Sequence, residues 1–231
     1  MKPLLEVFYQ PGKLFQSLPE RSYVWVLPLI LDMLLIVLAA WAVPHYMGRE
    51  NIARQQIETF ARNLTPEQVQ TAVSQATSPT RIYLGYVGAA AGTALIIAII
   101  AGALMAFGMM TSRSPRYGTV FSMVTLAFFP YWLITTAMTV LVLALSPDPA
   151  SMDWRNLLAT NPAAFMDRNT TAKGLYSLMG SLDVFSFYEI FLLSLGFSKI
   201  TRAKFGFGLG AVLLLWAFYV LGKMGLSLVF G

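Results

Sequence analysis

The stretch SLDVFSFYEIFLLSLGFS, from Ser181 to Ser198, decides the fold class, because it has the length and the apolar composition of a membrane span. About twenty predominantly apolar residues are enough for a helix to cross the hydrocarbon core of a bilayer. The same stretch contains Asp183 and Glu189, although carboxylates are costly on a helix that is surrounded by lipid. The role of these two acids therefore depends on which other parts of the chain lie in the membrane.

The composition of the whole chain is that of an integral membrane protein. Of its 231 residues, 57% are hydrophobic and 12% are charged, whereas a soluble domain carries about 25% charged residues. The net charge is +5, but the basic residues lie in short connections between apolar runs. We therefore attribute them to membrane topology and expect no nucleic-acid partner. The chain has no cysteine and one histidine, His45, so we expect no metal site and no cofactor.

Five apolar runs are long enough to span a bilayer, and each must be helical because an open strand would leave its backbone groups unpaired in lipid. The expected fold is all-α, a bundle of five transmembrane helices that follows a leader of residues 1–21. The spans are expected near residues 22–43, 82–110, 118–145, 175–197 and 206–229.

Basic residues set the expected orientation. With five spans, the leader and the connections 111–117 and 198–205 share one side of the membrane. These segments are dense in basic residues, namely Lys2, Lys13, Arg21, Arg113, Arg116, Lys199, Arg202 and Lys204. The loops 44–81 and 146–174 on the other side are longer and mix bases with acids. Because the side richer in Lys and Arg faces the cytoplasm, the N-terminus is expected inside and the C-terminus outside.

The leader is amphipathic in two pieces that Pro11 and Gly12 separate. We expect it to lie in the headgroup region, either as an anchor for the first span or as a surface for a partner. The expected faces are Leu4, Leu5 and Phe8 in the first piece, and Leu14, Phe15 and Leu18 in the second.

The loop after the first span is predicted to form two helices. Ile52, Ile57, Phe60 and Leu64 form an apolar stripe on the first. Thr65, Pro66 and Gln68 have the spacing of a capping box at the start of the second. The pair is expected to cap the bundle or to bind something outside. In the loop 146–174, Trp154 and Phe165 are expected near the membrane interface.

Two glycine motifs predict close helix contacts, Gly88 to Gly92 and Gly206 to Gly210. Small residues four apart let two helices approach closely, inside the bundle or between two copies of the chain. The chain lacks the phosphate-binding, zinc-protease, serine-hydrolase and dinucleotide motifs, so we expect no enzyme activity.

Four charged residues are expected inside spans: Asp32, Asp183, Glu189 and Lys223. Asp183 and Lys223 fall at similar depth on consecutive spans, which predicts an ion pair. Asp32 and Glu189 fall near the midplane, with no basic residue at that level. We expect these residues to be structural contacts in the bundle interior, with a solute, ion or proton site as the alternative.

The segment SLDVFSFYEIFLLSLGFSKITRAKFGFGLGAVLLLWAFYVLGKMG, Ser181 to Gly225, resembles the C-terminal half of the Yip domain family, and in particular its bacterial members. Asp183, Gly196, Ser198 and Lys204 match the family pattern, and Pro11 and Phe15 match the start of the family's leader. This chain departs from the family at Tyr188-Glu189, where members often have tryptophan.

The resemblance implies five spans and a membrane accessory role, since some bacterial relatives accompany ABC-type exporters. It does not imply GTPase binding, because the eukaryotic members use a long cytosolic N-terminal region for that purpose and this leader is short. We therefore expect a non-enzymatic scaffold or accessory subunit in a bacterial inner membrane, whose partner is a transporter or a second copy. The alternative is a small ion- or proton-coupled transporter that uses its intramembrane acids.

Overall fold

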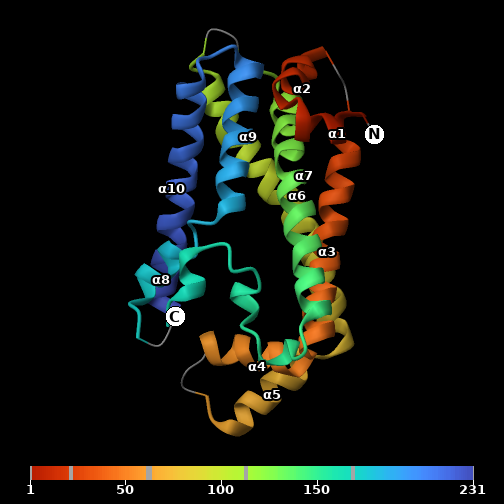
Figure 1. The fold of residues 1–231 in the computed structure, drawn as a ribbon, viewed down its shortest axis with the longest axis vertical. Coiled ribbons are helices and arrows are strands. Elements are labelled where there is room, and N and C mark those ends of the chain that lie inside the picture. Colours follow the sequence, from red (N-terminus) through yellow and green to blue (C-terminus); the bar gives the residue numbers. More distant parts are fainter. Residues whose placement is uncertain (1, 21–22, 61–63, 112–113, 168–169, 231) are drawn as a thin grey trace.

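The computed structural model describes residues 2–20, 23–60, 64–111, 114–167 and 170–230, and all regular secondary structure in these ranges is helical (Figure 1). Within them, five helices are long and apolar enough to cross a membrane, which confirms the expected five spans. These are α3 (Val26–Met47), α6 (Pro79–Gly108), α7 (Tyr117–Leu145), α9 (Val184–Thr201) and α10 (Phe205–Phe230). Arg21 and Arg113 lie outside the described residues.

The fourth span is shorter than the sequence indicated. The apolar run expected at 175–197 is divided into α8 (Lys173–Met179) and α9, with a break at residues 180–183. Gly180 ends α8 by donating its N–H to the Tyr176 carbonyl, and Asp183 is the N-cap of α9. Asp183 therefore lies at a helix start and not within a continuous span.

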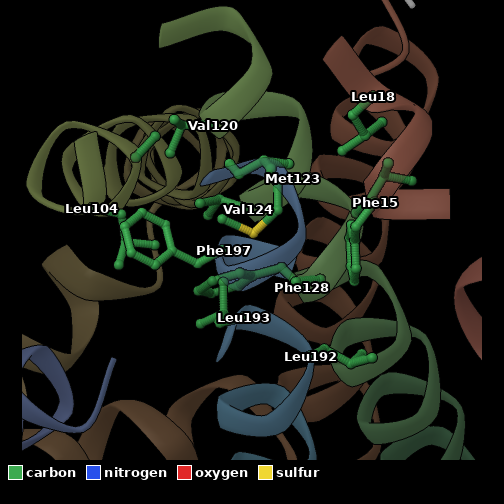
Figure 2. Close-up of a cluster of buried hydrophobic side chains, with 14 of the residues drawn as sticks. Phe15, Leu18, Leu104, Val120, Met123, Val124, Phe128, Leu192, Leu193 and Phe197 are labelled. Carbon is green, nitrogen blue, oxygen red and sulfur yellow. The ribbon is translucent and has the colours of Figure 1, made fainter. Parts of the chain in front are cut away.

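Helix α7 is the centre of the bundle, because it packs against α3, α6 and α9. Its buried residues run from Val120 to Pro130, and Pro130 stands inside the helix. Figure 2 shows the core that results, in which Met123, Val124 and Phe128 of α7 lie near Phe197 of α9 and Phe15 of the leader.

The leader packs into the bundle as well as covering its end. It forms α1 (Lys2–Tyr9), α2 (Pro11–Ser17) and the short 3-10 helix η1 (Leu18–Glu20), and α2 lies along α9. The second predicted apolar face is confirmed, since Leu14, Phe15 and Leu18 are buried. The first is partly wrong: Leu4 and Val7 are the buried residues of α1, while Leu5 and Phe8 are exposed.

At the opposite end of the bundle, α4 (Arg49–Phe60) and α5 (Pro66–Ala76) lie across the helix ends (Figure 1). Ile52 of α4 packs with Met47 and Leu143 at the ends of α3 and α7, so α4 covers the bundle. The Asn51 side-chain amide connects α4 to the loop 146–174, because it donates to the Ala150 carbonyl at 2.7 Å. These contacts are those of a cap. The predicted apolar stripe is only partly confirmed: Ile52 is buried, whereas Leu64 is exposed. The side chain of Phe60 lies outside the described part of the structure.

The predicted capping box at the start of α5 is confirmed. The Gln68 N–H donates to the Thr65 hydroxyl at 3.3 Å, and the Thr65 N–H donates to the Gln68 side chain at 2.9 Å. Pro66 occupies the first turn, where the lack of an N–H costs nothing.

The loop 146–174 contains three short 3-10 helices: η2 (Pro149–Ser151), η3 (Trp154–Asn156) and η4 (Pro162–Phe165). Trp154 packs against the Met47 cluster, whereas Phe165 is 81% exposed. Ala163 of η4 is buried, and η4 packs against α8. The loop therefore folds back over the α8–α9 break.

Candidate functional site

Asp183 connects the start of α9 to the loop 146–174. Its carboxylate accepts hydrogen bonds from the N–H groups of Phe185, at 2.8 Å, and Ser186, at 3.3 Å, so it caps the helix. The Thr160 hydroxyl donates to the same carboxylate. The Val184 N–H also donates to the Thr160 carbonyl, at 3.2 Å. The carboxylate is therefore matched by two helix amides and one hydroxyl, an arrangement that suits an ionised acid at a helix N-terminus.

The predicted ion pair between Asp183 and Lys223 is wrong. The Lys223 ammonium donates instead to the Ser181 hydroxyl at 3.2 Å, and that hydroxyl donates to the Ser177 carbonyl at 2.9 Å. No ion pair joins Asp183 and Lys223 in the part of the chain that the structure describes. The reason is the helix break, because it turns the Asp183 side chain towards the amides of α9 and leaves Ser181 facing α10.

Asp32 is the most deeply placed acid. It lies in α3 with none of its surface exposed, and both of its carboxyl oxygens lack a hydrogen-bond partner among the described residues. Most buried polar side chains in proteins have such a partner, because an unmatched polar group in an apolar interior costs free energy. Hydrogen bonds among the described residues therefore do not offset the cost of burying the Asp32 carboxyl.

Glu189 is the second acid in this region and is partly buried on α9. It interacts electrostatically with Asp32 of α3, Tyr131 of α7 and Tyr219 of α10. Glu189 therefore lies within electrostatic range of one acid and two phenols from three other spans, although Tyr219 is 62% exposed. Sequence reasoning identified both acids but missed both tyrosines, and the position of Tyr131 directly after Pro130 was the available signal.

Such a group of acids and phenols can hold a proton or a cation between the helices. Charged side chains inside a membrane are costly in free energy. An acidic side chain there therefore forms an ion pair, becomes neutral by protonation, or binds a cation. Among the described residues, the long helices contain the bases Arg81 and Lys199, each within a few residues of a helix end, and Lys223 in α10. The Lys223 ammonium is bound to Ser181. It therefore offers no direct partner to Asp32.

The four predicted packing glycines do not meet another helix within the chain. A Cβ built on Gly88, Gly92, Gly206 or Gly210 would have no described atom of a neighbouring element within 4 Å. The glycines that do lie in close contacts are others: a Cβ on Gly208 would lie 2.6 Å from the Ser194 carbonyl oxygen, and one on Gly196 would lie 2.6 Å from the Met123 side chain. Helical phase explains the difference, because Gly208 faces α9 while the glycines two residues before and after it face away.

A comparison with protein families places nearly the whole chain in one family. The model of the Yip1 domain matches residues 5–228, which include most of the leader, the loops 44–81 and 146–174, and all five spans except the last two residues of α10. No curated protein matches the chain, and no solved structure does. The matched range contains the positions that carried the resemblance, including Phe15 and Gly196, which pack together in the core. This multi-pass membrane chain belongs to the Yip1 domain family.

Proposed function

We propose that the protein is a non-enzymatic scaffold or accessory subunit of a membrane complex, and that it offers one face of α6 to a transmembrane partner. Yip1 domain proteins are generally non-enzymatic and are linked to membrane trafficking. The observation that carries the proposal is the surface of α6, which presents small residues that this chain leaves uncovered.

This surface, the α6 small-residue face, consists of Gly85, Gly88 and Gly92. These glycines recur at helical spacing, and none would bring a Cβ within 4 Å of a neighbouring element. By helical phase Leu95 and Ile96 lie on either side of this face, and they are 61% and 54% exposed. Glycines on a lipid-facing helix lose packing area, whereas they let a second helix approach closely. The geometry therefore favours a helix of another subunit as the neighbour of α6.

We infer that the client is a transporter, with an ABC-type exporter as the first candidate, in a bacterial inner membrane. The alternative occupant of the face is a second copy of this chain. Residues 4–18 of the leader are packed into the bundle through side chains such as Leu14 and Phe15, which supports a partner that contacts the spans.

Purification from the native membrane tests the proposal. The tagged protein is extracted in a gentle detergent, and the proteins that remain bound are identified and quantified by mass spectrometry. We expect one stoichiometric membrane partner, lost in the variant Gly88→Ile with Gly92→Ile. Gly222→Ile is the matched control, because Gly222 is also exposed and free of neighbours but lies on α10. A protein that purifies alone and as a monomer would contradict the proposal.

The uncompensated burial of Asp32 favours a second candidate function, transfer of protons or cations through the bundle. The group formed by Asp32, Glu189 and Tyr131 would carry it. Purified protein in liposomes is expected to give a proton or cation flux that Glu189→Gln abolishes. Glu67→Gln is the control, because Glu67 is exposed on α5 outside the spans. Flux equal to that of empty liposomes excludes this function.

A further inference from the structure

A cavity of about 490 Å³ lies at the end of the bundle that carries the leader. It is bounded by α2 and η1 of the leader on one side, and by the last turn of α9 and the start of α10 on the other. Its polar lining consists of Gln16, Ser198, Lys199 and Arg202. The volume is within the range of small-ligand sites, about 300 to 1,000 Å³.

The two basic side chains of the cavity are not neutralised by the described residues. Lys199 and Arg202 are exposed, and neither has an ion-pair partner in the described part of the structure. No acidic residue is among the described residues that line the cavity. The cavity therefore has a surplus of positive charge, which favours an anionic ligand.

Arg202 has an unusual backbone conformation for this position. It follows the last turn of α9 with φ of 56° and ψ of 23°, the left-handed region in which glycine is the usual residue. A side chain there costs about 1 kcal/mol. Arg202 lines the cavity, and guanidinium groups bind phosphate oxygens in a bidentate manner.

The apolar part of the lining indicates what is attached to the anion. Leu195 and Phe205 form walls beside the basic groups, and Pro19 of η1 closes the leader side. Phe205 is also the first residue of α10, and the first amides of a helix have no acceptor within the helix. Because α9 and α10 are spans, this end of the cavity meets the membrane surface. A ligand that combines a phosphate with apolar chains fits both halves of the lining.

We propose that the cavity between the leader and the α9–α10 turn binds the phosphate headgroup of an anionic phospholipid, held by Lys199 and Arg202. The site is separate from the α6 small-residue face, so either assignment can fail without the other. A soluble phosphate compound carries the same anionic group as the lipid headgroup. The experiment below therefore distinguishes a bound lipid from a bound soluble phosphate.

Native mass spectrometry of the detergent-purified protein measures the bound lipid directly. The protein is incubated with an equimolar mixture of phosphatidylglycerol and phosphatidylcholine, and the ratio of the two adducts is recorded. Lys199→Gln and Arg202→Gly are compared with the unaltered chain, singly and together. Arg202→Gly suits the left-handed backbone, so this variant keeps the fold while it removes the charge. Arg116→Gln is the control, because Arg116 is an exposed base at the same end of the bundle that does not line the cavity.

We expect the unaltered protein and Arg116→Gln to prefer phosphatidylglycerol, and each cavity variant to lower that preference by about tenfold, as the loss of one charge-assisted contact implies. Equal binding of the two lipids would overturn the proposal, and so would an unchanged preference in the double variant. Glycerol 3-phosphate is added in a parallel sample. Displacement of phosphatidylglycerol by millimolar glycerol 3-phosphate would show a site for a soluble anion and would also overturn the lipid assignment.

Discussion

Gly208 of α10 lies directly against the backbone of α9, since a Cβ at this position would be 2.6 Å from the carbonyl oxygen of Ser194. Backbone atoms in a packed helix cannot move aside as a flexible side chain can. We therefore expect Gly208→Ala to separate α9 from α10 and to lower the free energy of unfolding by about 1–3 kcal/mol. Thermal unfolding in detergent measures this effect. Gly210→Ala is the control, because a Cβ there meets open space, and equal melting temperatures for the two variants would contradict the observed packing.

Asp183 should contribute to stability through the α9 cap and the Thr160 contact. Asp183→Ala removes the cap, which costs about 1 kcal/mol, and leaves the Thr160 hydroxyl without its acceptor. Asp183→Asn retains an oxygen that can cap the helix, so it should be milder. Thermal unfolding again provides the measurement, and a milder effect of alanine than of asparagine would contradict the assignment.

A charge exchange tests the absence of an Asp183–Lys223 pair. Lys223 is bound to Ser181, and a lysine at position 183 would place a positive charge at the N-terminus of α9. The double variant Asp183→Lys with Lys223→Asp should therefore yield no more folded protein than whichever single variant yields less. Size-exclusion chromatography measures the amount of folded protein. Recovery to the level of the unaltered chain would indicate the ion pair that the structure lacks.

The capping box of α5 predicts a local effect on the cap that α4 and α5 form. Thr65→Ala removes the acceptor of the Gln68 N–H and should destabilise the first turn of α5 by about 1 kcal/mol. Hydrogen exchange of residues 66–76 should then be several times faster. Gln75→Ala is the control, because the Gln75 side chain is exposed on the same helix and takes no part in the capping box. Unchanged exchange in Thr65→Ala would show that tertiary contacts alone hold α5.

The orientation of the chain can be tested cleanly, because the sequence has no cysteine. Ser74 on α5 and Lys204 before α10 are exposed at opposite ends of the bundle. A membrane-impermeant maleimide should label Ser74→Cys on intact cells and should label Lys204→Cys only after permeabilisation, since the basic end is expected inside. The reverse pattern would place the N-terminus outside.

Much of the fold could be predicted from sequence, because apolar length is a strong signal in membrane proteins. It located the five spans, and the spacing of Thr65 and Gln68 located the start of α5. The break between α8 and α9 was missed because Gly180 and Asp183 lie within one apolar run. A glycine followed by an acid three residues later is itself a signal of one helix ending and another beginning.

The candidate sites were less predictable. A glycine motif shows that a helix can be approached closely but does not show which face is covered, so Gly208 was overlooked in favour of Gly206 and Gly210. The similar expected membrane depth of Asp183 and Lys223 predicted an ion pair. The directions of their side chains, however, depend on the break between α8 and α9. The cavity at Lys199 and Arg202 required the leader to fold back onto α9, which amphipathicity alone does not determine.

The most direct measurement of the central claim is site-specific photocrosslinking in the native membrane. A photoreactive residue is placed at Gly88 on the α6 small-residue face, and at Leu34 on the lipid-facing side of α3 as the control, since Leu34 is 59% exposed. The account predicts one discrete protein adduct at position 88, either a transporter subunit or a second copy of the chain, and lipid adducts at position 34. Lipid adducts alone at both positions would contradict the claim that α6 is a partner face.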